Sequence, residues 1–67
     1  MAITMKAARA NVNLSQIEMA RRLNISKNTY QNYESYKTIP DIEIAKRFAA
    51  ICNLTVDDII FYRPVAV

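Results

Sequence analysis

This chain of 67 residues is 52% hydrophobic and 22% charged, which is the composition of one small globular domain and not of a disordered segment. It has no histidine and no glycine, which excludes Ser–His and Cys–His catalytic groups, histidine metal sites and glycine-rich phosphate loops. We therefore expect no enzyme, no cofactor, no metal and no small-molecule ligand. Because the sequence lacks an apolar run of about 18 residues and a signal-peptide pattern, we expect no membrane contact and a cytoplasmic location.

The net charge of +3 is unevenly distributed along the chain. Residues 1–37 hold six basic and two acidic side chains, a net charge of +4, whereas residues 38–67 hold three basic and four acidic ones, a net charge of −1. A basic surface attracts the phosphates of nucleic acids without reading their sequence. The first half of the chain is therefore the part expected to meet a polyanion.

The first predicted helix covers residues 3–11, with Met5, Ala8 and Val12 facing inwards. A short link to Leu14 follows, of the length expected between packed antiparallel helices.

The second predicted helix begins at a capping box formed by Ser15 and Glu18. Ala20 lies on its inner face, where a methyl side chain allows another helix to approach closely. Asn24 is the expected helix end, because asparagine tolerates the left-handed conformation well. Ile25 then fills the corner before the next helix.

The third predicted helix begins after Ser26 and runs to about Ser35. One face is mostly aromatic and consists of Tyr30, Tyr33 and Glu34. The other face consists of Lys27, Asn28, Gln31 and Asn32. Amides can bind adenine edges and lysine can bind guanine edges, although an ordinary solvated face has the same composition. The capped helix and tight corner before it favour a DNA-reading helix-turn-helix over about residues 15–35.

A fourth helix is predicted after Pro40, with Asp41 as its cap. Its packed stripe consists of Ile42, Ala45, Phe48, Ala49 and Cys52. Because the single cysteine lies on this stripe, we expect a buried thiol and not a reactive one.

A fifth helix is predicted from Thr55, with two aspartates in its first turn, where the helix dipole favours acids. The tail, residues 61–67, is apolar, and Pro64 favours an extended edge strand over a helix. The expected homodimer surface consists of Ile60, Phe61, Tyr62 and Val65. The alternatives are a tail packed on its own chain or a disordered tail.

The chain resembles the phage Cro/repressor-type (Xre-like) helix-turn-helix family over roughly residues 5–60. The residues that carry the resemblance are Leu14-Ser15-Gln16, Met19-Ala20, Leu23-Asn24-Ile25-Ser26, Tyr30, Tyr33-Glu34-Ser35, Lys37-Thr38, Ile39-Pro40, Ala45, Phe48-Ala49, Asn53-Leu54-Thr55 and Asp57-Asp58-Ile59. The resemblance implies an all-α, compact, five-helix lambda-repressor-like fold, with residues 1–67 as one DNA-binding domain and a short extended C-terminal tail.

The resemblance also implies that Arg9 pairs with Glu34 and ties the first helix to the end of the third; a solvent-facing Arg9 is the alternative. Asn13 and Tyr36 stand where the family usually has glycine. Asparagine adopts the left-handed conformation readily, whereas for tyrosine it costs on the order of 1 kcal/mol. Either Ser35 or Tyr36 therefore accepts strain, or this loop differs from the family form.

These observations predict a transcriptional regulator that binds a double-stranded DNA operator as a homodimer. The resemblance implies that Gln16 binds a phosphate and supports the third helix. One of Arg21 or Arg22 is expected to bind phosphate with Lys37. Base contacts are expected from Lys27, Asn28, Gln31 and Asn32, with Thr29 on a phosphate or a thymine methyl. The rival interpretations are a modulator that binds a partner repressor protein, with Ile17 as a protein-contact residue, and the antitoxin of a toxin–antitoxin pair.

Overall fold

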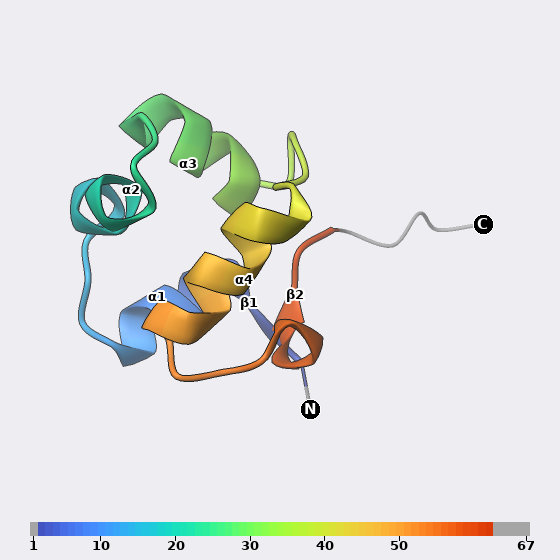
Figure 1. Cartoon of the computed structure of the whole chain (residues 1–67). Coiled ribbons are helices and arrows are strands. Elements are labelled where there is room, and N and C mark those ends of the chain that lie inside the picture. Colours follow the sequence, from blue (N-terminus) through green and yellow to red (C-terminus); the bar gives the residue numbers. More distant parts are fainter. Residues whose placement is uncertain (1, 63–67) are drawn as a thin grey trace.

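The computed structural model describes residues 2–62 and consists mainly of helices (Figure 1). In chain order the elements are β1 (Ile3–Thr4), α1 (Met5–Asn11), α2 (Gln16–Leu23), α3 (Lys27–Glu34), α4 (Ile42–Ile51), the 3-10 turn η1 (Val56–Asp58) and β2 (Ile59–Ile60). The expected contact residue Val65 lies outside the described residues. No helix in the described part is long and apolar enough to cross a membrane.

The helices begin where a polar side chain caps them. The Ser15 hydroxyl accepts from the Glu18 N–H at 3.1 Å, and the Glu18 carboxylate accepts from the Ser15 N–H at 3.0 Å, so the predicted capping box is present. Ser26 and Asp41 cap α3 and α4 in the same way, by accepting from Thr29 and Ile44 N–H groups. These bonds satisfy N–H groups that the first helical turn leaves without a partner.

The first helix begins two residues later than the sequence predicted, at Met5. Thr4 is its cap, accepting from the Ala7 N–H at 3.1 Å. Ile3 and Thr4 are extended and pair in parallel with Ile59 and Ile60. A pairing with the far end of the chain therefore takes these two residues out of the helix.

All four α-helices end at a residue with a left-handed backbone, at Asn13, Asn24, Tyr36 and Asn53. Each end has the paired bonds of a Schellman motif; after α3, Tyr36 N–H donates to Tyr33 and Lys37 N–H donates to Asn32. Glycine usually fills this position, but the chain has none. Of the expected alternatives, it is Tyr36 that accepts the strained conformation, with φ of 64°.

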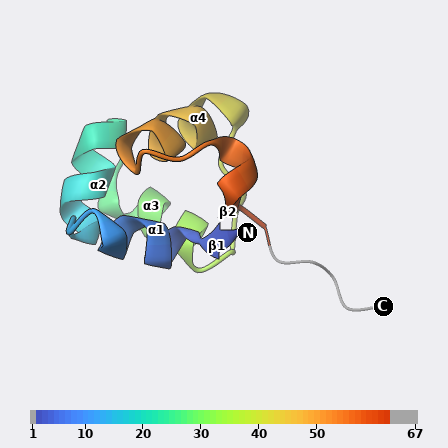
Figure 2. The same cartoon turned by 90° about the horizontal axis from the view of Figure 1, so that it is seen from below.

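The core lies between α4 and the group formed by α1, α2 and α3 (Figures 1 and 2). Its largest fully buried side chains are Tyr30, Phe48, Met5, Met19 and Leu23. Ala20 is also buried, in the predicted close approach of α2 to its neighbours. The thiol of Cys52 is buried at the end of α4, which raises its pKa because the thiolate is desolvated there.

The predicted fifth helix is wrong. Thr55 starts a single 3-10 turn, in which Asp58 N–H donates to the Thr55 carbonyl at 3.0 Å. The Asp58 carboxylate accepts from both the N–H and the hydroxyl of Thr55. From Ile59 the chain is extended and pairs with β1, as suits a run of β-branched and aromatic residues.

Two further side chains are not where the sequence predicted. Ile42 heads the expected packed stripe but is the first residue of α4 and is 63% exposed. Phe61 was expected on a dimer surface but is buried in its own chain, with its ring edge-on to Phe48 at 6.0 Å between centroids. A tail packed on its own chain was the stated alternative, and within the described residues it holds for Phe61, whereas Tyr62 is 61% exposed.

Candidate nucleic-acid interface

A polar hollow of about 480 Å³ lies between α1, the start of α2 and the outer face of α3. It is lined by Lys6, Arg9, Gln16, Asn28, Gln31, Asn32, Glu34, Ser35 and Lys37. Five of the residues expected to bind DNA are among them, and they come from three separate segments of the chain. The hollow therefore brings amide and basic side chains together on one surface.

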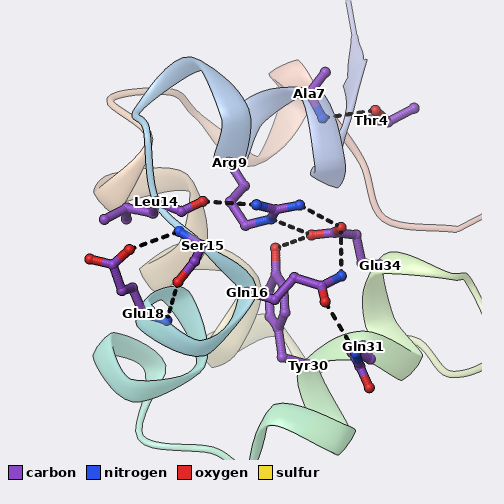
Figure 3. A network of polar contacts seen from close by, with 10 residues as sticks. All are labelled: Thr4, Ala7, Arg9, Leu14, Ser15, Gln16, Glu18, Tyr30, Gln31 and Glu34. Atoms are coloured by element: carbon purple, nitrogen blue, oxygen red, sulfur yellow. Dashed lines mark hydrogen bonds and ion pairs between the residues drawn. The ribbon is translucent and has the colours of Figure 1, made fainter.

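The wall of the hollow is held by an ion pair between α1 and the last residue of α3 (Figure 3). Arg9 Nε donates to Glu34 Oε2 at 2.8 Å and Arg9 Nη2 donates to Glu34 Oε1 at 3.0 Å. Arg9 Nη1 donates to the Leu14 carbonyl at 2.8 Å. The structure thus brings together the pair that the resemblance implied, and one guanidinium fixes α1, the α1–α2 link and α3.

Glu34 accepts two more hydrogen bonds from side chains around it (Figure 3). The Tyr30 hydroxyl donates to Oε2 at 2.6 Å and Gln16 Nε2 donates to Oε1 at 3.1 Å. Burial alone would raise the pKa of Glu34, but the bonds from Arg9, Tyr30 and Gln16 outweigh it and lower the pKa. The carboxylate therefore stays ionised and paired, and it does not present an unpaired negative charge to a polyanion.

Gln16 carries this arrangement on to the exposed face of α3. Its Oε1 accepts from Gln31 Nε2 at 3.1 Å, while its Nε2 is bonded to Glu34 (Figure 3). This bond turns the amide nitrogen of Gln31 towards α2. The carbonyl oxygen and second N–H of Gln31 take no part in it, so this amide has one acceptor and one donor for a ligand.

The rim of the hollow combines amides with two lysines. Asn28 on α3 and Lys6 on α1 are exposed, as is Lys37 after α3. The backbone of Lys37 is fixed, because its N–H donates to the Asn32 carbonyl at 2.9 Å in the motif that ends α3. The strained Tyr36 backbone therefore sets where this lysine leaves the helix.

Four residues expected to bind DNA are not in the lining of the hollow. Arg21 and Arg22 are exposed in the last turn of α2, and Lys27 is the exposed first residue of α3. The Thr29 hydroxyl accepts from the Ser26 hydroxyl at 2.8 Å, so it forms part of the helix cap. These side chains do not line the hollow.

Lys6 and Ser35 line the hollow but were not predicted as site residues. The signal for Lys6 was present in the sequence, since Lys6 and Arg9 are three residues apart and share one face of α1. Ser35 carried no comparable signal, because its place depends on where α3 ends.

The family model described as Helix-turn-helix matches residues 5–59, which is most of the chain. No curated protein and no solved structure gave a match. The matched segment contains α2 and α3 with the capped corner between them, and also the Arg9–Glu34 pair. The chain therefore belongs to the Xre/Cro-like helix-turn-helix family of DNA-binding regulators.

Proposed function

We propose that this protein is a sequence-specific transcriptional repressor of the Cro type, which inserts α3 into the major groove of its operator. The observation that carries the proposal is the polar hollow, in which three amide side chains of α3 are bordered by Lys6 and Lys37. Amides read base edges and lysines neutralise phosphates, so this surface has both parts of a specific DNA contact.

In this proposal Asn28, Gln31 and Asn32 contact bases, and Lys27 reaches a guanine near the start of α3. Gln31 suits adenine, because bidentate recognition of that base needs one donor and one acceptor on the same amide. The bond to Gln16 fixes the orientation of this amide before DNA binds. Less side-chain freedom is then lost on binding.

Most of the remaining polar residues contact the DNA backbone. Gln16 binds a phosphate beside the α3 contact, Lys37 and Lys6 bind phosphates at the rim of the hollow, and Thr29 offers its methyl group to a thymine. One of Arg21 or Arg22 adds a phosphate contact. Two copies bind as a homodimer to half-sites about one helical turn, or roughly 34 Å, apart.

The test uses the purified protein and a duplex site selected by it from a random library. Asn28→Ala is expected to weaken binding to the selected site by about 1–3 kcal/mol and to relax the base preference at one position. The Lys37→Ala variant is expected to weaken binding to all sequences. It is also expected to reduce by about 1 the slope of the logarithm of the binding constant against the logarithm of the salt concentration. Lys46→Ala, an exposed lysine on α4, is the matched control and is expected to change neither.

Failure to select any site above random DNA would refute direct operator reading. An unchanged site preference in Asn28→Ala, Gln31→Ala and Asn32→Ala would show that α3 does not read the bases.

A second candidate function is modulation of a partner repressor protein. The observation in its favour is Ile17, which is 50% exposed and follows Gln16, a residue that lines the hollow. A large apolar side chain at this position suits a protein contact better than a phosphate contact. Loss of a partner complex in Ile17→Ser, with operator binding unchanged, would establish this function.

A further inference from the structure

Three side chains in the lining of the hollow form a hydrogen-bonded row that ends on the outer face of α3 (Figure 3). Gln16 Nε2 donates to Glu34 Oε1 at 3.1 Å, and Gln16 Oε1 accepts from Gln31 Nε2 at 3.1 Å. The side chain of Glu34 is only 6% exposed, whereas Gln31 is partly exposed. We call Glu34, Gln16 and Gln31 the amide relay, because they connect a buried carboxylate to an amide that a ligand can reach.

Glu34 sets the direction of both bonds in the amide relay. Its Oε1 also accepts from Arg9, and its Oε2 accepts from Arg9 and Tyr30. An ionised carboxylate can only accept, so Gln16 must turn its amide nitrogen towards Glu34. A reversed Gln16 would place its carbonyl oxygen against a carboxylate oxygen. The low exposure of Glu34 strengthens that repulsion and makes the reversed orientation unfavourable.

The orientation of Gln16 then determines which groups Gln31 offers to a ligand. Because Gln16 turns its carbonyl oxygen towards α3, Gln31 uses one of its two N–H groups in that bond. The second N–H group and the carbonyl oxygen of Gln31 remain for a ligand. If Gln16 were reversed, Gln31 would accept from it and would keep both N–H groups for the ligand.

Adenine and guanine require different groups from such an amide. In the major groove adenine has an acceptor at N7 and a donor at N6, whereas guanine has two acceptors, N7 and O6. Two simultaneous bonds to adenine therefore need one donor and one acceptor, and two bonds to guanine need two donors. In the amide relay Gln31 has the groups for adenine and lacks the second donor that guanine requires.

We propose that Glu34 and Gln16 make Gln31 select adenine over guanine, although neither of the two contacts a base. The inference rests on the proposed function, in which Gln31 faces a base of the operator. An unrestrained glutamine can bind either purine, because its amide can rotate to offer a donor with an acceptor or two donors. The amide relay leaves only the first of these. Glu34 and Gln16 are therefore positioning residues that determine base specificity.

The test compares adenine with guanine at the base pair that Gln31 reads, which is the position where Gln31→Ala loses its preference in the selected site. Wild type is expected to bind the adenine site about 10-fold more tightly, since a bidentate contact gives discrimination of this order. In Gln16→Met this ratio is expected to fall to about 3-fold or less, because Gln31 regains its second donor. Loss of the phosphate contact of Gln16 weakens both sites alike and does not change the ratio.

Glu34→Gln tests whether the carboxylate sets the direction. The variant keeps the shape of the side chain, but an amide at position 34 can donate as well as accept, so Gln16 can reverse. The ratio is again expected to fall to about 3-fold or less. Glu43→Gln, which removes an exposed carboxylate of α4, is the matched control and is expected to keep the wild-type ratio. If Glu34→Gln does not fold, Gln16→Met decides the question.

The inference is overturned if Gln31→Ala changes no base preference, or if Gln16→Met keeps the wild-type ratio. A second measurement uses the protein without DNA and follows the side-chain amide protons of Gln31 by NMR. The proton bonded to Gln16 is expected to move upfield in Gln16→Met, and unchanged resonances would also overturn the inference. A protein that selects no site refutes the proposed function and the choice of adenine with it, whereas the NMR spectra still show whether the amide relay forms.

Discussion

The two halves of this molecule share one apolar core but differ in what else holds them together. In residues 5–35 the buried side chains Met5, Met19, Leu23 and Tyr30 pack in that core. Polar bonds centred on Arg9 and Glu34 also join α1, α2 and α3 around the hollow. In residues 36–62 the positions of α4 and β2 depend on ring packing around Phe48 and on the pairing of β2 with β1. Hydrogen bonds are directional, whereas apolar packing is not. The half that presents the amide side chains of α3 at set angles therefore adds hydrogen bonds to its packing.

Replacement of Phe61 by alanine is expected to have the largest effect. The ring is 8% exposed and packs edge-on against Phe48, so its removal leaves a cavity and is expected to lower the free energy of unfolding by about 3 kcal/mol. Chemical denaturation measures this loss. The neighbouring variant Tyr62→Ala removes a 61% exposed ring and is expected to change the unfolding of dilute protein by about 0.5 kcal/mol or less. Equal effects of the two variants would mean that Phe61 is not a core residue.

Glu34→Gln is expected to have the next largest effect and to lower the free energy of unfolding by about 3 kcal/mol or slightly less at neutral pH. The variant keeps the shape of the side chain but leaves the Arg9 guanidinium, 14% exposed, without its counter-charge. Glu43→Gln is the matched control, because its ion pair with Arg47 is solvent-exposed and is expected to contribute about 0.5 kcal/mol or less. Denaturation at pH 7 compares the two; similar losses would refute the special role of the buried pair.

The same pair predicts a pH dependence of stability. The pKa of Glu34 in the folded protein lies below its ordinary value of 4.5, so the stability from this carboxylate is complete above that value. It is lost as the pH falls below 4.5 and through the lowered pKa. Glu18 and Asp58 also have lowered pKa values, held by backbone N–H groups of Ser15 and Thr55, and they titrate in both proteins. The stability difference between wild type and Glu34→Gln is therefore expected to shrink in acid; a constant difference would contradict the assignment.

The features that the sequence predicted lie mainly in the first half of the molecule, and those that it missed lie mainly in the second half. The caps at Ser15, Ser26 and Asp41 depend on residues three positions apart, so the local sequence was sufficient to predict them. Helical periodicity predicted that Asn28 and Gln31 share the outer face of α3, whereas the place of Gln16 beside that helix came from the resemblance to the family. The fold after Thr55 was missed, because β2 exists only through its pairing with residues at the other end of the chain. The exposure of Ile42 was also missed, because the helical stripe of α4 does not show where its packing on the other helices begins.

Tyr36 links the two halves, and Tyr36→Phe is expected to lower the free energy of unfolding by about 1 kcal/mol. The variant keeps the ring and the left-handed backbone but removes the hydroxyl that donates to the Ile60 carbonyl at 3.0 Å. The lost bond is expected to loosen the α3–α4 loop, and amide exchange at Lys37 is the measurement that detects this. Tyr33→Phe, a half-buried tyrosine on α3, is the control. Unchanged exchange at Lys37 would show that the backbone motif alone holds the loop.

Asn53→Gly is expected to have the smallest effect, about 0.5 kcal/mol or less in either direction. Asn53 has φ of 60°, close to the 64° of Tyr36, but a short polar side chain is compatible with this conformation. Glycine would relieve little strain there, and it would give the unfolded chain more freedom, which opposes any gain. Thermal unfolding measures the change. A gain in the free energy of unfolding well above 1 kcal/mol would mean that asparagine is strained at these helix ends. The chain, which has no glycine, would then carry backbone strain at all four left-handed helix ends and not at Tyr36 alone.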